Sequence, residues 1–344
     1  MPDTRPQSLS YATPTKRDPL QLSGSYVDDW AWRWTSQGIW AGAVAIVLCP
    51  ILVMYFLSKA GPINSNISGM FLTAFLAALV IVQTLLFARG EIDFSAVATL
   101  LLVGCLYTRM SQSAGVLVAF ACAITVAVLI GFINGVIATW LGGGTMLTTL
   151  ASAVALQSLA SIVSGDRSTP FSYPTAASRT AVVALLGLLV FMLAFAGVAL
   201  RELSIGFREV SSDEKAPHRE RMTTTWFLVG SSTVAGLCGI AQPHFYGAMA
   251  GASGGWTAIW ILTAVMIGGT VFGGRNPNVV AAVLASALAS MGSSLVQRSV
   301  SQSAWGTLLL AVVSLACLGL SVWLHRYFQH RFDVSASRSL RKSA

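Results

Sequence analysis

Long runs of apolar residues follow one another along most of this chain, separated by short polar or glycine-rich stretches. A helix needs roughly 20 apolar residues to cross a bilayer core of about 30 Å. By that measure the sequence predicts ten apolar segments, at residues 37–58, 67–88, 94–109, 115–140, 146–164, 180–203, 224–248, 256–272, 277–296 and 304–325. The third and eighth segments are short and bounded by glycine or charge, which predicts broken or re-entrant helices packed inside the protein. The pattern is typical of an all-α integral membrane protein.

Composition and charge agree with a bilayer as the surroundings of this chain. Of its 344 residues, 55% are hydrophobic and 10% are charged, against roughly 25% charged in soluble domains. A soluble protein of this length would need many more charges on its surface. The net charge of +8 comes from basic residues that lie between and beyond the apolar runs. This distribution favours membrane topology over a nucleic-acid-binding face.

The placement of lysine and arginine predicts the orientation of the chain. With the N-terminus inside the cell, sixteen of the 21 basic residues fall on cytoplasmic segments and five fall outside, which follows the positive-inside rule. Both termini are then cytoplasmic. The expected organisation is a disordered N-terminal tail at 1–34, a transmembrane domain at 35–326 and a C-terminal tail at 327–344.

Several kinds of chemistry find no support in the sequence. No lysine directly follows a glycine, so a phosphate-binding P-loop is not expected. The histidines lack metal-binding spacing, and the five cysteines contain no CxxC pair, so we expect neither a metal site nor disulfides. Only Glu91 and Asp93 approach the apolar segments as acidic residues. Because ion-coupled carriers place such residues within the bundle, their scarcity counts against a self-powered carrier.

Several ordered motifs resemble one transporter family. Gly90-Glu-Ile-Asp-Phe-Ser95 resembles the Gly-Gly-Ile-Asp-Leu-Ser stretch of ribose-type sugar permeases of ATP-binding cassette (ABC) importers, within the branched-chain-amino-acid/sugar permease superfamily. The motif positions are Gly90, Ile92, Asp93 and Ser95. Asn134-Gly135 and Thr145-Met-Leu-Thr-Thr-Leu150 are similar to later helices of that family. Gly268-Gly-Thr-Val-Phe-Gly-Gly-Arg275, with Gly273 and Gly274, is similar to its glycine-rich turn.

The resemblance implies a permease subunit of about ten helices arranged as an inverted repeat. Such a subunit works in the bacterial inner membrane with a second permease copy or paralogue. Two separate ATPase subunits bind ATP and magnesium, and a periplasmic solute-binding protein delivers the solute. This chain itself would be non-catalytic and hold no cofactor. Its solute would be small and polar, most simply a sugar.

The charged segment 204–222 occupies the place of that family's ATPase-coupling loop. The residues assigned to this role are Arg208, Glu209, Ser211, Ser212, Asp213, Glu214, Lys215, Ala216 and Arg219. Their mixed charges suit the rim of a protein contact, and Ser211 or Ser212 could cap a short helix with acids in its first turn. The loop departs from the family pattern at Ala216-Pro217 and Arg221. We expect Pro217 to break or shift the helix.

A polar solute needs hydrogen-bonding groups along its route. The candidates are Asn134, Thr145, Thr148, Gln157, Gly268, Gly269 and Thr270. Asp93 and Ser95 are expected first as a helix cap, and the glycines of 131–135 and 236–239 predict close helix packing. Two alternatives to an importer stay open. They are an ion-coupled secondary carrier and a non-transporting membrane subunit that recruits or regulates partners.

Overall fold

The computed structural model describes residues 64–165, 167–171, 176–202, 216–249, 255–270, 272, 277–299 and 312. Within them the helices are α2 (Asn64–Arg89), α3 (Ser95–Ser113), α4 (Val116–Thr139), α5 (Thr145–Ser164), α6 (Ala176–Glu202), α7 (Ala216–Tyr246), α8 (Gly255–Ile267) and α9 (Val279–Ser299). Strands β1 (Thr169–Pro170) and β2 (Ala248–Met249) pair antiparallel, with Thr169 opposite Met249.

These helices correspond to eight of the predicted apolar segments. The segments at 37–58 and 304–325 lie outside the described residues, apart from Val312, so the ten-helix count and the inverted repeat stay predictions. Among the described helices, five are long and apolar enough to cross a membrane, at Met70–Arg89, Val116–Thr139, Thr145–Ser164, Arg179–Ala199 and Glu220–Tyr246. The chain therefore has the helices of a membrane protein. The eighth segment forms α8 of 13 residues, about 20 Å long and shorter than a bilayer core.

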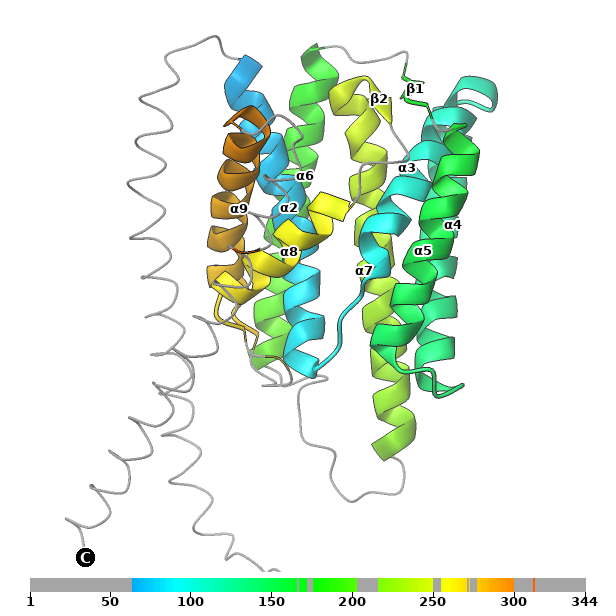
Figure 1. The fold of residues 1–344 in the computed structure, drawn as a ribbon, viewed down its shortest axis with the longest axis vertical. Coiled ribbons are helices and arrows are strands. Elements are labelled where there is room, and N and C mark those ends of the chain that lie inside the picture. The colour runs from blue at the N-terminus through cyan, green and yellow to red at the C-terminus, as the bar shows by residue number, and fades with distance from the viewer. Residues whose placement is uncertain are drawn as a thin grey trace, which may run out of the picture.

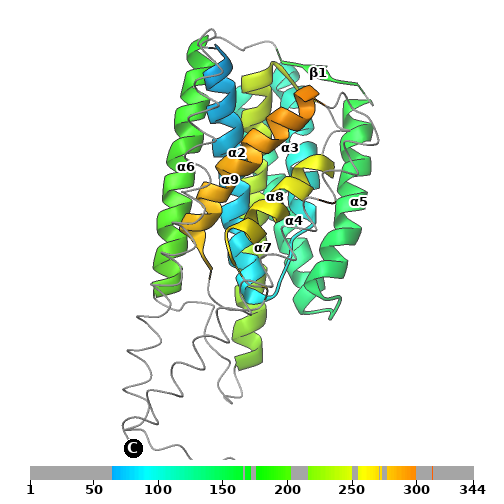
Figure 2. The same cartoon turned by 60° about the vertical axis from the view of Figure 1, so that its left-hand side comes forward.

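Successive helices run in alternating directions through the bundle (Figure 1). The end of α2, the α4–α5 turn, the end of α6 and the start of α7 lie at one end, which we call the Arg89 end. The β1–β2 pair and the α3–α4 turn lie at the other end. Figure 2 shows α2, α6 and α9 on one side of the bundle and α4 and α5 on the other.

The outer helices expose large apolar side chains, whereas α2 and α7 are mostly buried. Residues that are at least half exposed include Leu117, Phe132, Leu147, Val154, Leu188, Phe191 and Phe195. In water such a surface would be an extended apolar patch, which soluble monomers rarely carry. It is the surface that contact with lipid tails requires. Inside the bundle, Cys105 and Cys238 are buried and pack as small apolar side chains.

Glycines allow α7 to approach its neighbours closely. A Cβ added at Gly131 of α4 would lie 2.6 Å from the Cα of Val229, and one at Gly135 would lie 2.8 Å from the Cα of Thr225. Gly239 of α7 likewise lies directly against the carbonyl oxygen of Leu100. The predicted close packing at these glycines is confirmed, and it fixes α3, α4 and α7 against one another.

Pro217 lies at the start of α7. The helix begins at Ala216 and continues unbroken to Tyr246. Pro217 therefore lies in the first turn, where backbone N–H groups have no partner within the helix and the missing N–H of proline costs little. The coupling segment before Ala216 lies outside the described residues, so the expected break or shift of a coupling helix by Pro217 stays a prediction.

Candidate functional site

The polar loop of residues 90–94 connects α2 to α3. After Arg89, Gly90 adopts a φ of 84°, and the N–H groups of Gly90 and Glu91 bond to the carbonyls of Phe87 and Leu86 at 3.0 Å. This left-handed glycine ends α2 and reverses the chain. The loop then rises between the helices to the start of α3 (Figure 1, cyan). Backbone at that depth needs hydrogen-bond partners from the protein.

Asp93 lies in this loop with only 4% of its surface exposed. Its Oδ1 accepts hydrogen bonds from the Ser95 N–H at 2.9 Å and the Ser95 hydroxyl at 2.6 Å. The contact to the Ser95 amide is the cap predicted from the sequence. Its Oδ2 accepts a bond of 2.6 Å from Ser231 of α7. Among the described residues no lysine or arginine forms an ion pair with Asp93, so hydroxyl groups and the α3 N-terminus surround its carboxyl group.

The carboxylate of Asp93 sets the direction of a chain of hydrogen bonds. A carboxylate only accepts, so the Ser95 hydroxyl donates its proton to Asp93 and accepts the bond from Asn134 Nδ2 at 2.9 Å. Asn134 Oδ1 then accepts from the Ser152 hydroxyl at 2.5 Å. This chain, the Asp93 network, joins α3, α4 and α5. In such a buried network the hydrogen bonds strengthen one another when every polar group has a partner.

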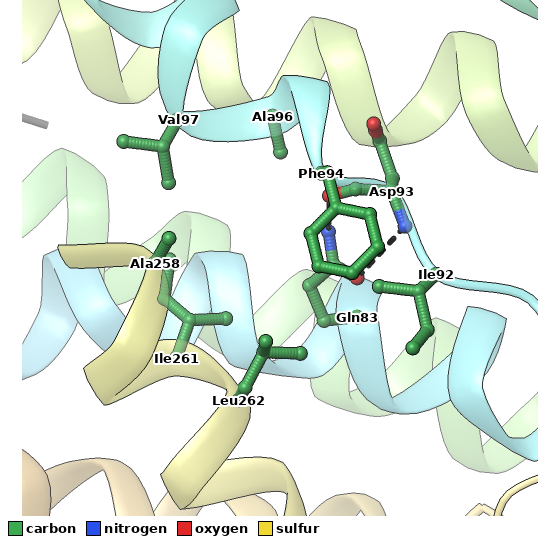
Figure 3. Close-up of a pocket in the computed structure, with 9 residues that line it drawn as sticks. All are labelled: Gln83, Ile92, Asp93, Phe94, Ala96, Val97, Ala258, Ile261 and Leu262. Carbon is green, nitrogen blue, oxygen red and sulfur yellow. Dashed lines mark hydrogen bonds between the residues drawn. The ribbon is translucent and has the colours of Figure 1, made fainter. Parts of the chain in front are cut away.

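Side chains from two other helices hold the loop backbone. Gln83 of α2 donates to the Asp93 carbonyl at 2.8 Å and accepts from its N–H at 3.4 Å, as Figure 3 shows. Thr149 of α5 accepts a bond of 3.2 Å from the Phe94 N–H and lies 3.1 Å from the Ile92 carbonyl. The loop therefore depends on contacts from widely separated parts of the sequence.

A small cavity separates the loop from α8. Its volume is about 10 Å³, close to the minimum for one water molecule. Gln83, Asp93 and Phe94 line one side, and Ala258, Ile261 and Leu262 of α8 line the other (Figure 3). Apolar side chains of α8 thus form one wall of the space beside Asp93.

At the Arg89 end, a second polar cluster joins the loop to α7. Thr224 accepts a bond from Arg89 Nη2 at 2.9 Å and donates to Glu91 Oε1 at 2.6 Å. Arg89 Nε lies 3.6 Å from Glu91 Oε2, and its guanidinium lies 5.0 Å from the Phe227 ring centroid. Burial raises the pKa of the Glu91 carboxyl above its ordinary value, and the positive charge of Arg89 partly opposes this.

An open pocket of about 230 Å³ lies beside this second cluster. Its lining residues are all polar: Glu91, Thr139, Thr145, Glu220, Arg221 and Thr224. In a chain with so few charges, this pocket gathers hydroxyl, carboxylate and guanidinium groups at one place. It is suited to hydrogen bonding with water or with a hydroxyl-bearing solute.

The predicted path residues do not all lie together. Asn134 belongs to the Asp93 network, and Thr145 lines the polar pocket. Thr148 is buried against Gly143, whereas Gln157 is exposed on α5. The remaining three lie at the α8–α9 turn, where Gly268 packs on Ala282, Gly269 has a φ of 72° and Thr270 accepts a bond from the Asn278 N–H at 3.1 Å.

Most of the predicted coupling residues cannot be placed. Arg208, Glu209, Ser211, Ser212, Asp213, Glu214 and Lys215 lie outside the described residues, as do Gly273 and Gly274 of the glycine-rich turn. Ala216 and Arg219 belong to the first turns of α7. The helix that follows the coupling segment is therefore described, and the segment itself is not.

Sequence reasoning missed four residues that hold the loop: Gln83, Thr149, Thr224 and Ser231. It also missed Ser152, which extends the Asp93 network. Two signals could have found some of them. Gln83 is the one amide side chain in the apolar run 71–88, and a lone polar group at membrane depth predicts a buried partner. Thr224 and Ser231 are seven positions apart, so they lie on the same face of a helix.

No protein-family model, curated protein or solved structure matches this chain. The membrane helices and the polar loop are accordingly the observations from which a function is inferred.

Proposed function

We propose that this chain is a permease subunit of an ABC importer for a small polar solute, most simply a sugar. It works in the bacterial inner membrane beside a second permease subunit. Separate ATPase subunits carry ATP and magnesium, and an external solute-binding protein delivers the solute. The ordered motifs at 90–95, 134–150 and 268–275 support this family assignment.

The proposal depends mainly on one observation: α6 ends and α7 begins at the same end of the bundle. The end of α6 and the start of α7 both lie at the Arg89 end (Figure 1). The charged segment between them must therefore begin and end there. Ten charged residues fall within 201–221, and the positive-inside rule assigns this end to the cytoplasm. A long charged segment on that side is suited to docking a soluble motor.

Two helices that start inside the bundle, α3 of 19 residues and α8 of 13, give further support. At 19 residues α3 is longer than the short helix predicted for the third segment. Figure 1 shows α3 and α8 starting within the bundle and running toward opposite ends. Phe94 and Val97, at the start of α3, face Ala258 and Ile261 of α8 across the small cavity. Transporters place such broken helices at the solute route, because irregular backbone survives in a membrane only where protein or a water-filled cavity covers it.

The proposal is tested by purifying the chain from its own membranes and replacing Asp213 and Glu214 with lysine. We expect the wild-type chain to copurify with an ATPase at equal stoichiometry, and the double variant to lose both that ATPase and solute uptake. Asp333→Lys, in the predicted C-terminal tail, is the matched charge-reversal control. A double variant with normal uptake and ATPase association contradicts the role of the loop. A wild-type chain without any ATPase contradicts the importer itself.

One observation favours a second candidate, the ion-coupled carrier. Asp93 lies inside the bundle, and proton- and ion-coupled carriers place acidic side chains within the bundle as relay groups. A carrier predicts uptake that follows an ion gradient and persists without ATP. Uptake into vesicles that contain this chain alone distinguishes the two.

A further inference from the structure

We propose that Glu91 and Asp93 are positioning residues that clamp the 90–94 loop to α7, so that a movement of α7 also moves the start of α3. This inference rests on the proposed function, in which a motor pushes on the segment before α7. It names the contacts through which that push would reach the interior of the bundle.

The lower clamp lies near the start of α7. Thr224 accepts from Arg89 and donates to Glu91, at 2.9 and 2.6 Å, and the Arg89 guanidinium also lies 5.0 Å from the Phe227 ring centroid. Only 3% of Thr224 is exposed, although it lies at the edge of the open polar pocket. A buried hydroxyl that loses its partners costs more than an exposed one.

The upper clamp lies seven residues further along the same helix. Ser231, with 2% of its surface exposed, donates to Asp93 Oδ2 at 2.6 Å. Positions 224, 227 and 231 share one face of α7, and the first and last are about 10 Å apart along its axis at 1.5 Å per residue. Two attachments at that separation fix both the height and the rotation of α7 relative to the loop.

The clamp continues beyond the loop through the Asp93 network. Asp93 accepts hydrogen bonds from the amide and hydroxyl of Ser95 in the first turn of α3. Asn134 donates to that hydroxyl and accepts a bond from Ser152. A neighbouring face of α7, at Thr225 and Val229, is packed on the α4 glycines. A displacement of α7 that keeps its hydrogen bonds therefore carries the loop and α3 with it.

Hydrogen exchange of the full-length chain in lipid nanodiscs, followed by mass spectrometry, tests the clamp. Thr224→Val and Ser231→Ala change only α7, yet we expect backbone amides of residues 90–96 to exchange about five- to tenfold faster, because Thr224→Val loses two buried hydrogen bonds and Ser231→Ala loses one. Glu91→Gln and Asp93→Asn change only the loop. We expect faster exchange at 220–226 in the first and at 228–234 in the second, because coupling between two sites is reciprocal.

Two variants serve as controls. Thr233→Val removes an α7 hydroxyl that bonds to the Val229 carbonyl of its own helix at 2.7 Å, and it should leave residues 90–96 unchanged. Thr224→Ser keeps the hydroxyl and should retain wild-type exchange, which separates the hydrogen bond from side-chain packing. If a loop variant aggregates, the α7 variants still decide the question.

Three results would overturn the clamp: faster exchange confined to the substituted element, an equal effect of Thr233→Val, or additive effects of Ser231→Ala and Asp93→Asn in the double variant. Partners in one interaction must show less than additive effects. The measurement involves neither ATPase nor solute. A failed clamp therefore leaves the importer proposal standing, and a chain that copurifies with no ATPase leaves the clamp standing.

Discussion

Asp93→Ala is the substitution with the largest expected effect on stability. It removes the acceptor of three buried donors, namely the Ser95 N–H, the Ser95 hydroxyl and the Ser231 hydroxyl. A buried donor left without its partner costs about 1–3 kcal/mol, and each serine hydroxyl can recover part of this by turning toward a carbonyl of its own helix. We therefore expect a loss of roughly 3–5 kcal/mol in the free energy of unfolding.

Asp93→Asn should be milder because it preserves the shape of the side chain. Its Oδ1 can still accept both bonds from Ser95, while its NH₂ group faces the Ser231 hydroxyl and must donate to it. The cost should be about 1–2 kcal/mol, the value of one reversed hydrogen bond and a lost charge. Thr84→Val is a matched control, since the Thr84 hydroxyl is buried but bonds only to the Val80 carbonyl of its own helix.

The assay is equilibrium unfolding of the purified chain in mixed micelles, followed by tryptophan fluorescence. The expected order of destabilisation is Asp93→Ala, then Asp93→Asn, then Thr84→Val. If Asp93→Ala unfolds within about 1 kcal/mol of the wild type, the carboxylate does not hold the network. If Asp93→Asn costs as much as Asp93→Ala, the negative charge itself is required and the hydrogen-bond reasoning is refuted.

Three further substitutions test the packing, the network and the buried acid. Gly131→Ala should destabilise the bundle by about 2–4 kcal/mol, because the added Cβ overlaps the α7 backbone. Gly230→Ala is the control, since its added Cβ meets open space, and it should not destabilise the bundle. Equal effects of the two variants in unfolding assays would refute the close contact. Ser152→Ala should cost about 1–2 kcal/mol by leaving Asn134 Oδ1 without its donor, and a neutral effect would break the proposed chain. Since the pKa of Glu91 is raised above 4.5 in the folded chain, folding favours its protonated form, and stability should fall as pH rises from 4.5 through the higher folded pKa. Glu91→Gln should remove that slope from unfolding curves measured across pH, and an unchanged slope would assign it to another group.

The helices themselves were predictable because length and hydropathy fix them. The predicted segment 115–140 becomes α4 at Val116–Thr139, and 146–164 becomes α5 at Thr145–Ser164. In both cases glycines at the ends leave little freedom in where the helix stops. The eighth segment is predicted to be too short to cross the bilayer, and it forms α8 of 13 residues.

The surroundings of each polar residue were less predictable. Asp93 and Ser95 are only two positions apart in the sequence, so the rules for helix starts predict the contact between the Asp93 carboxyl group and the Ser95 amide. The contact between Asp93 and Ser231 spans 138 positions and depends on how the helices cross. The same limit explains Gln157, which lies exposed on α5 while Asn134 is buried. Neither α4 nor α5 has a strongly one-sided apolar pattern from which the inward face could be recognised.

The cavity beside Asp93 determines what would be needed to wet the centre of the bundle. It has room for about one water molecule. Ala258, Ile261 and Leu262 line the side that faces Asp93, and they belong to a helix of fewer than four turns that is followed by Gly268 and Gly269. An outward shift of that one short helix would enlarge the space for water beside the Asp93 carboxyl group.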